Sequence, residues 1–163
     1  MYKVYHYLNF LLKSTNQHGV HSPFIFDFVT KGLYIKNKIS RKVNDHSEFK
    51  KLSKKEQLIL SKVLTYFKID EISVDLQKTS KALSKDYILF YINTLNYLYN
   101  SNLKINKENH ILLVKGIYDN KKNNKIWNNF LASTPNIVSV NLFYFGVIFY
   151  RPQQAKEHFK IRV

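Results

Sequence analysis

The sequence contains no cysteine, which excludes several kinds of site at once. Disulfide bonds, zinc–thiolate centres and cysteine nucleophiles all require a thiol. The chain also has no apolar run of the roughly 18 residues that cross a membrane, and its first residues lack the basic flank and apolar core of a signal peptide. We therefore expect a soluble cytoplasmic protein with no transmembrane segment.

Glycine is scarce as well. The chain has four glycines in 163 residues, at Gly19, Gly32, Gly116 and Gly146, and no two of them are close together in sequence. Loops that cradle phosphates or nucleotides need several neighbouring glycines, because their backbone approaches the ligand closely. Neither a Walker-type loop nor a Gly-x-Ser-x-Gly nucleophile motif occurs. The glycine distribution therefore argues against an ordinary nucleotide-binding loop.

Acidic residues are few: 11 Asp and Glu stand against 26 Lys and Arg, which gives a net charge of +15. Such an excess favours contact with a polyanion, namely nucleic acid, ribonucleoprotein or anionic lipid. An AT-rich genome produces the same bias by raising Lys, Asn, Ile and Tyr together, and composition does not separate the two explanations. The candidate polyanion contacts are Lys36, Lys38, Arg41, Lys42, Lys50, Lys51, Lys54 and Lys55.

The N-terminal part of the chain reads as helices followed by a polar linker. Periodic apolar residues predict a helix over residues 2–13, and Ser22 with Pro23 predicts the start of a second helix that ends about Gly32. Residues 34–52 are rich in Lys, Asn and Ser with little periodicity, which favours a surface crossing or a flexible arm. The predicted apolar face of the first helix consists of Val4, Tyr5, Leu8, Leu11 and Leu12.

From Ser53 onward, strands and helices alternate. Ser53 and Glu56 form a capping box for a helix, and the last two strands are joined so closely near Gly146 that they should be antiparallel. This order predicts an α/β domain with a mixed sheet. We expect residues 1–52 (helices and a basic linker) and 53–163 (the α/β core) to form one structural unit. The predicted strands are 71–76, 87–92, 110–114, 137–143 and 145–150. Besides the helix that begins at Ser53, the predicted helices of this part are 93–103 and 121–131.

Two segments, residues 11–24 and residues 145–162, resemble the two ends of a family of class I SAM-dependent methyltransferase-like proteins from Bacteroidetes. The first contains Gln17-His18-Gly19-Val20-His21-Ser22-Pro23, and the second contains Phe145-Gly146-Val147-Ile148-Phe149-Tyr150-Arg151. The resemblance implies a Rossmann-like sheet. In that sheet the second and third strands lie at one edge, and strands matching them are missing here. We expect a truncated sheet of about five strands, in the order first, fourth, fifth, seventh and sixth, ending in an antiparallel hairpin.

The resemblance also implies cofactor contacts that this sequence lacks. Where the family has a glycine-rich turn around SAM, residues 72–80 contain no glycine. The strand whose terminal carboxylate would bind the ribose is missing. Where the family has paired aspartates, the chain has Lys115 and Gly116. We therefore expect no bound cofactor, no metal and no catalytic residue. The shortened sheet also exposes a new edge strand, through which a homodimer could form.

A polar loop between the first two predicted helices is the remaining candidate site. It could be an interaction loop, or its histidines and serine could satisfy backbone groups and cap the following helix. A metal site is disfavoured, because no acidic residue or third ligand lies nearby in sequence. The loop residues are Asn16, Gln17, His18, His21 and Ser22.

These observations predict a non-catalytic methyltransferase-like protein, a pseudoenzyme, that serves as an interaction or scaffold module for a protein or an anionic macromolecule. One alternative is a divergent SAM-dependent methyltransferase, in which backbone groups near residues 74–80 or a second chain hold SAM. The other alternative is a basic nucleic-acid-binding module.

Overall fold

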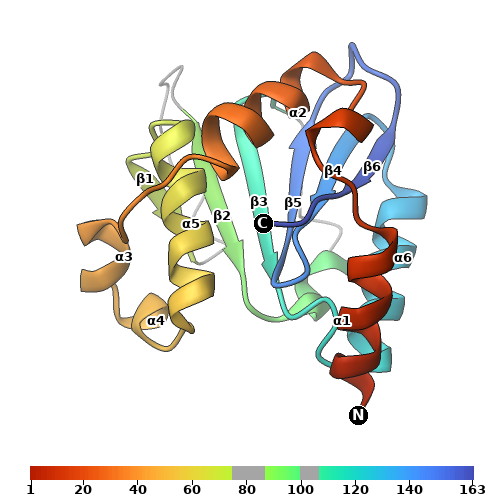
Figure 1. Ribbon diagram of the computed structural model, residues 1–163, viewed down its shortest axis with the longest axis horizontal. Coiled ribbons are helices and arrows are strands. Elements are labelled where there is room, and N and C mark those ends of the chain that lie inside the picture. Colours follow the sequence, from red (N-terminus) through yellow and green to blue (C-terminus); the bar gives the residue numbers. More distant parts are fainter. Residues whose placement is uncertain (75–86, 100–106) are drawn as a thin grey trace.

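A mixed sheet of six strands runs through the computed structural model, which describes residues 1–74, 87–99 and 107–163 (Figure 1). The strand order is β1-β2-β3-β5-β4-β6. The first three neighbours are parallel, β5 is antiparallel to both β3 and β4, and β6 is parallel to β4. The predicted α/β class is thus confirmed. The strands are β1 (Glu71–Ser73), β2 (Ile88–Ile92), β3 (His110–Lys115), β4 (Ile137–Asn141), β5 (Phe145–Tyr150) and β6 (Glu157–Lys160).

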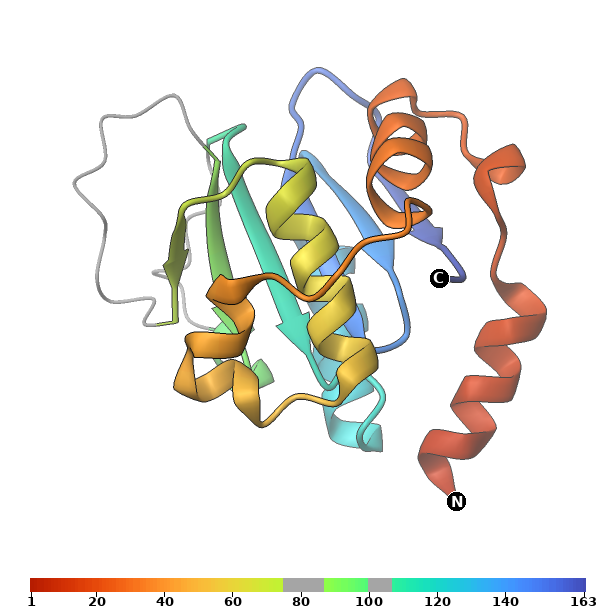
Figure 2. The same ribbon diagram turned by 60° about the vertical axis from the view of Figure 1, so that its left-hand side comes forward.

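Helices cover both faces of the sheet (Figures 1 and 2). Ile111 and Leu113 of β3 pack into the core beneath α5, whereas Leu112 and Val114 pack into the core beneath α6. Because successive side chains of a strand point to opposite faces, an uninterrupted apolar run is what a strand buried on both sides requires. The helices are α1 (Tyr2–Lys13), η1 (Gln17–Gly19), α2 (Pro23–Asp27), η2 (Phe28–Leu33), α3 (Arg41–Asp45), α4 (Ser47–Lys50), α5 (Lys54–Tyr66), η3 (Leu95–Tyr99) and α6 (Lys121–Ser133).

The predicted helix starts are confirmed at the level of hydrogen bonds. The Ser22 hydroxyl accepts from the backbone N–H of Ile25 at 3.4 Å, and both halves of the Ser53–Glu56 capping box are formed. The predicted strand 71–76 is described only as far as Val74, and the predicted helix 93–103 corresponds to η3; residues 75–86 and 100–106 lie outside the described residues. None of the described helices could span a membrane.

Residues 34–52 lie largely at the surface, as predicted, but contain more regular structure than expected. The segment forms α3 and α4, and Val43 and Phe49 in them are completely buried. Helices of five and four residues each contribute one fully buried apolar side chain, so no helical stripe is visible in the sequence. The lysines and asparagines that dominate the composition lie on the outer side of an ordered segment.

The end of the chain also differs from expectation. The predicted antiparallel pairing of β4 and β5 is confirmed, and the tight turn between them lies at Leu142–Tyr144, close to Gly146, where Phe143 has a positive φ of 66°. A sixth strand follows the hairpin, so the sheet does not end there. Its sequence, Glu157–Lys160, buries only Phe159, which is too little apolar periodicity to recognise.

Gly146 lies in β5 and leaves room for the side chain of Trp127. A Cβ atom at position 146 would lie 2.2 Å from Cη2 of the indole, which is almost fully buried on α6. We therefore expect Gly146→Ala to lower the free energy of unfolding by about 1–3 kcal/mol, as overpacking does. Combining it with Trp127→Phe should cost less than the sum of the two single substitutions, measured by chemical denaturation. Strict additivity would contradict this packing.

Candidate functional site

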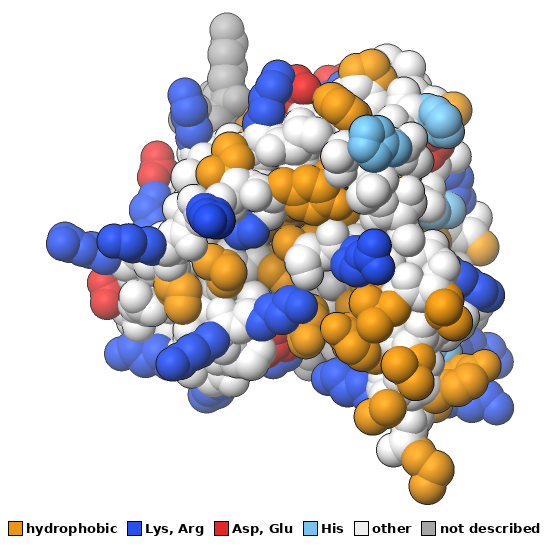
Figure 3. Space-filling view, viewed as in Figure 1, with side chains coloured by type: hydrophobic (Ala, Val, Ile, Leu, Met, Phe, Trp, Pro, Cys, Tyr) orange, Lys and Arg blue, Asp and Glu red, His pale blue; other side chains and the backbone are white. Residues whose placement is uncertain are grey.

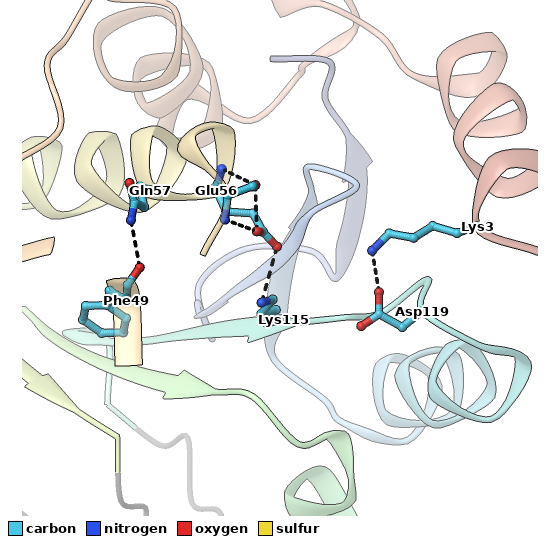
Figure 4. A network of polar contacts seen from close by, with 7 residues as sticks. Lys3, Phe49, Glu56, Gln57, Lys115 and Asp119 are labelled. Carbon is cyan, nitrogen blue, oxygen red and sulfur yellow. Dashed lines mark hydrogen bonds and ion pairs between the residues drawn. The ribbon is translucent and has the colours of Figure 1, made fainter. Parts of the chain in front are cut away.

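The carboxyl ends of the parallel strands β1, β2 and β3 lie side by side at one end of the sheet, which is where ligands bind in open α/β folds. At the end of β3, Lys115 Nζ lies 3.6 Å from Glu56 Oε1 on α5 (Figure 4). The other oxygen, Glu56 Oε2, accepts from the backbone N–H and the hydroxyl of Ser53 at 2.8 and 2.7 Å. Both carboxylate oxygens therefore have partners within the protein, and Glu56 is only 9% exposed.

The turn after β3 contains a second ion pair. Gly116 has φ +77°, and a Cβ atom there would lie 2.6 Å from Asp119 Oδ2. The other Asp119 oxygen, Oδ1, lies 2.6 Å from Lys3 Nζ on α1 (Figure 4). Glu56 and Asp119 are thus each paired with a lysine at this end of the sheet (Figure 4). Neither carboxylate is free to act as a base or to bind a metal.

The segment that precedes α5 packs on the sheet near the end of β2. The ring of Phe49 on α4 packs edge-on against Tyr91 with centroids 5.0 Å apart, and His46 stacks on Phe49 at 4.3 Å. The side chain of Gln57 on α5 holds this segment in place, since its Nε2 donates to the Phe49 carbonyl at 3.0 Å. Burial, with Glu56 and Glu48 nearby, raises the pKa of Tyr91 well above its usual range, so the phenol stays neutral.

The polar loop at residues 16–22 makes mainly local contacts. Asn16 Oδ1 accepts from the backbone N–H of His18 at 3.1 Å, and Gln17 Nε2 lies 3.3 Å from His18 Nε2. Ser22 is buried and caps α2, while His18 and His21 are exposed. No group of three His, Asp or Glu side chains within the described ranges is arranged to hold a metal ion. Asn16 and Ser22 thus have clear structural roles.

The loop also joins the two ends of the chain. Gln154 Nε2 donates to the Ser22 hydroxyl at 2.8 Å, and the guanidinium of Arg151 lies 4.3 Å from the ring centroid of Phe24. The backbone N–H of Thr15 donates to the Lys160 carbonyl at 2.8 Å, and Thr15 forms a parallel bridge with Ile161. The segments 11–24 and 145–162, which are far apart in sequence, therefore pack against each other.

All eight predicted polyanion contacts are exposed, and we call them the basic surface. They lie on the segment before α3, on α3 and α4, and at the start of α5, where Figure 3 shows many blue and few red side chains. Lys42 pairs with Asp70, Lys51 pairs with Glu48, and Lys55 Nζ lies 5.2 Å from the ring centroid of Tyr144. Within the described part of the chain, no ion pair engages Lys36, Lys38, Arg41, Lys50 and Lys54.

A hollow of about 370 Å³ adjoins the basic surface between α3 and the end of α5. Arg41, Lys42 and Lys68 line it together with the hydroxyl-bearing Ser40 and Thr65 and with the carboxylate of Asp70, which pairs with Lys42. Arg41 and Lys68 have no ion pair in the described part of the chain, and such cations suit a phosphate group. Lys68 was not among the predicted contacts, because it follows α5 and only the fold brings it beside Arg41.

A second hollow, of about 390 Å³, lies between α1, α6 and the strands β4 and β6. In it Ser139 Oγ lies 2.9 Å from His158 Nδ1, and burial and Lys156 lower the pKa of that histidine, which favours its neutral form. Ser139 is 1% exposed, and no carboxylate lines the hollow to orient the imidazole. The two residues are cross-strand neighbours in the sheet register, so the contact is best explained as sheet packing and not as a nucleophile with its base.

Within the described residues, Lys115 pairs with Glu56 at the end of β3 and Phe49 packs on Tyr91 near the end of β2, whereas the eight cations of the basic surface are exposed. Comparisons of the chain with protein-family models, with curated proteins and with solved structures gave no match.

Proposed function

We propose that this chain is a methyltransferase-like protein without methyltransferase activity, and that it acts as an interaction module whose basic surface binds an anionic macromolecule. The observation that carries the first part is the packing of the chain's own side chains at the carboxyl ends of β2 and β3. Lys115 pairs there with Glu56, and Phe49 packs on Tyr91 near the end of β2. A nucleoside cofactor would need backbone to approach closely and a carboxylate to bind its ribose.

The strand order supports the kinship. The resemblance implies first, fourth, fifth, seventh and sixth for a sheet that has lost its second and third strands, and β1-β2-β3-β5-β4 has this order, with the penultimate member antiparallel to its neighbours. The two segments that carry the resemblance also pack on each other through Ser22 and Gln154. Strand β1 lies at the sheet edge, so dimerisation through that edge remains a prediction.

Electrostatics supports the second part. Helix α5 begins with Lys54 and Lys55, although cations are unfavourable at the positive end of a helix dipole. The cost is about 0.3–1 kcal/mol for each such charge. Five exposed cations of the basic surface lack an ion-pair partner in the described chain, so they are available to an anionic partner. Such a partner would also offset the unfavourable interaction of Lys54 and Lys55 with the helix dipole.

Binding of a fluorescently labelled single-stranded RNA, used as a polyanion probe, tests the second part. We expect log Kd to rise linearly with log salt concentration, because each neutralised phosphate releases counterions. Absence of binding at low salt, or binding that is insensitive to salt, would contradict the proposed role of the basic surface.

A further inference from the structure

Helix α1 carries a row of apolar side chains that no other described part of the chain covers. Val4, Tyr5, Leu8 and Leu12 are 64%, 67%, 57% and 87% exposed, and we call them the apolar stripe. At 3.6 residues per turn these positions share one face of the helix. The periodic pattern thus identified a real apolar face, but that face points to solvent. Figures 1 and 2 both place α1 at the periphery of the molecule.

A different face of α1 attaches the helix to the body. Phe10 is buried, and the rings of Tyr7 and Phe10 lie 4.8 and 5.6 Å from the ring of Phe143. His6 stacks on Tyr118 at 5.4 Å. Since Phe10 projects from the side of the helix opposite the apolar stripe, the stripe points directly away from the fold. It is unnecessary for holding α1 in place.

Cations flank the apolar stripe on both sides. On one side Lys121 and Lys125 of α6 line a shared hollow with Tyr2 and His6 of α1. On the other side the ring of Phe143 contacts Tyr144 at 5.3 Å, and Lys55 Nζ lies over Tyr144. Figure 3 shows the orange side chains of this region with blue ones to either side. Neither α1 nor α6 contains an acidic residue.

An apolar stripe with Lys121 and Lys125 on one side and Lys55 on the other matches one partner best. Two copies paired through the apolar stripe would bring the flanking lysines of both copies together, and like charges repel. A membrane that contains anionic lipids offers an apolar layer beneath a negatively charged surface, and a helix lying in the interface contacts both. We propose that α1 binds the surface of an anionic membrane, with the apolar stripe in the acyl-chain boundary and Lys55, Lys121 and Lys125 at the headgroups.

Flotation with lipid vesicles tests this proposal. The full chain should float with vesicles of mixed phosphatidylcholine and phosphatidylglycerol and not with phosphatidylcholine alone. Leu8→Gln combined with Leu12→Gln should lower the partition coefficient by at least about tenfold, because apolar area is lost without a change of charge. Ile35→Gln combined with Tyr97→Gln is the matched control, since these side chains are also exposed (51% and 47%) but lie outside α1. It should float as the wild type does.

The same variants separate this proposal from the proposed function. Leu8→Gln with Leu12→Gln should keep the wild-type affinity for RNA, because the basic surface is unchanged. If that variant floats as well as the wild type, the basic surface alone binds the vesicles and the proposal is wrong. If the wild type is a dimer in analytical ultracentrifugation and the variant is a monomer, a second copy covers the stripe and the proposal is wrong as well.

Insertion of α1 into the membrane can be measured directly, because the absence of cysteine allows a label at a single position. An environment-sensitive fluorophore on Leu8→Cys should shift to shorter wavelength when anionic vesicles are added. The same label on Ile35→Cys should not shift. An unchanged spectrum at position 8 would overturn the proposal.

Discussion

Replacing Phe49 by Ala is expected to lower the free energy of unfolding by about 3–5 kcal/mol, the usual cost of removing a fully buried aromatic side chain. Phe49 is completely buried, lies against Tyr91 of the sheet and is stacked by His46. The loss would be large for a domain of this size, whose total stability is about 5–15 kcal/mol. Urea denaturation followed by far-ultraviolet circular dichroism measures it.

Lys50→Ala is the matched control for this substitution. Lys50 is the next residue on the same short helix and is exposed, so its replacement should change stability by no more than about 0.5 kcal/mol. Equal and small effects of the two substitutions would mean that residues 41–50 are not part of the core. The packing near the end of β2 would then no longer argue against a cofactor.

Four glutamine substitutions on the basic surface should weaken RNA binding more than any other surface change. Lys36, Lys38, Lys50 and Lys54 are exposed and lack ion pairs in the described chain. If all four contact phosphates of a single strand, the slope of log affinity against log salt should fall by about 3, at about 0.7 per contact. Affinity at low salt should fall by at least about tenfold. Fluorescence anisotropy at several salt concentrations measures both quantities.

The control removes the same amount of charge elsewhere. Lys121, Lys122, Lys125 and Lys156 are also exposed, and their replacement by Gln should leave the salt slope nearly unchanged. An equal loss of affinity in both variants would show that net charge alone, and no particular surface, attracts the polyanion. That result would favour a compositional origin of the positive charge.

Local signals in the sequence were sufficient for most of the regular structure. The Ser53–Glu56 capping box and the Ser22–Pro23 pair each specify a helix start through hydrogen bonds within one turn. The apolar runs of β2 and β3 are uninterrupted because both faces of these central strands are buried. Such features depend only on neighbouring residues, so they can be predicted without knowledge of the fold.

Features that depend on distant partners were missed. Val43 and Phe49 lie in helices too short for a periodic pattern, and Phe159 is the only buried residue of β6. The packing role of Gly146 was not recognised, because it is set by Trp127, nineteen positions away. In each case the deciding contact lies far along the chain.

The candidate site shows the same division. The absence of a carboxylate at Lys115 and Gly116 was visible in the sequence, but the pairing of Lys115 with Glu56 was not, because α5 and β3 meet only in the folded protein. Exposure of the eight cations followed from their polar surroundings in the sequence. The contribution of Lys68 beside Arg41 did not, since it requires the end of α5 to lie against α3.

Calorimetric titration of the full chain with SAM tests the central claim most directly. A site filled by Phe49 and by the Lys115–Glu56 pair should give no saturable heat, which corresponds to a Kd weaker than about 1 mM and less than about 4 kcal/mol of binding free energy. Saturable binding with a Kd near 1 μM, about 8 kcal/mol, would contradict the account and favour a divergent methyltransferase.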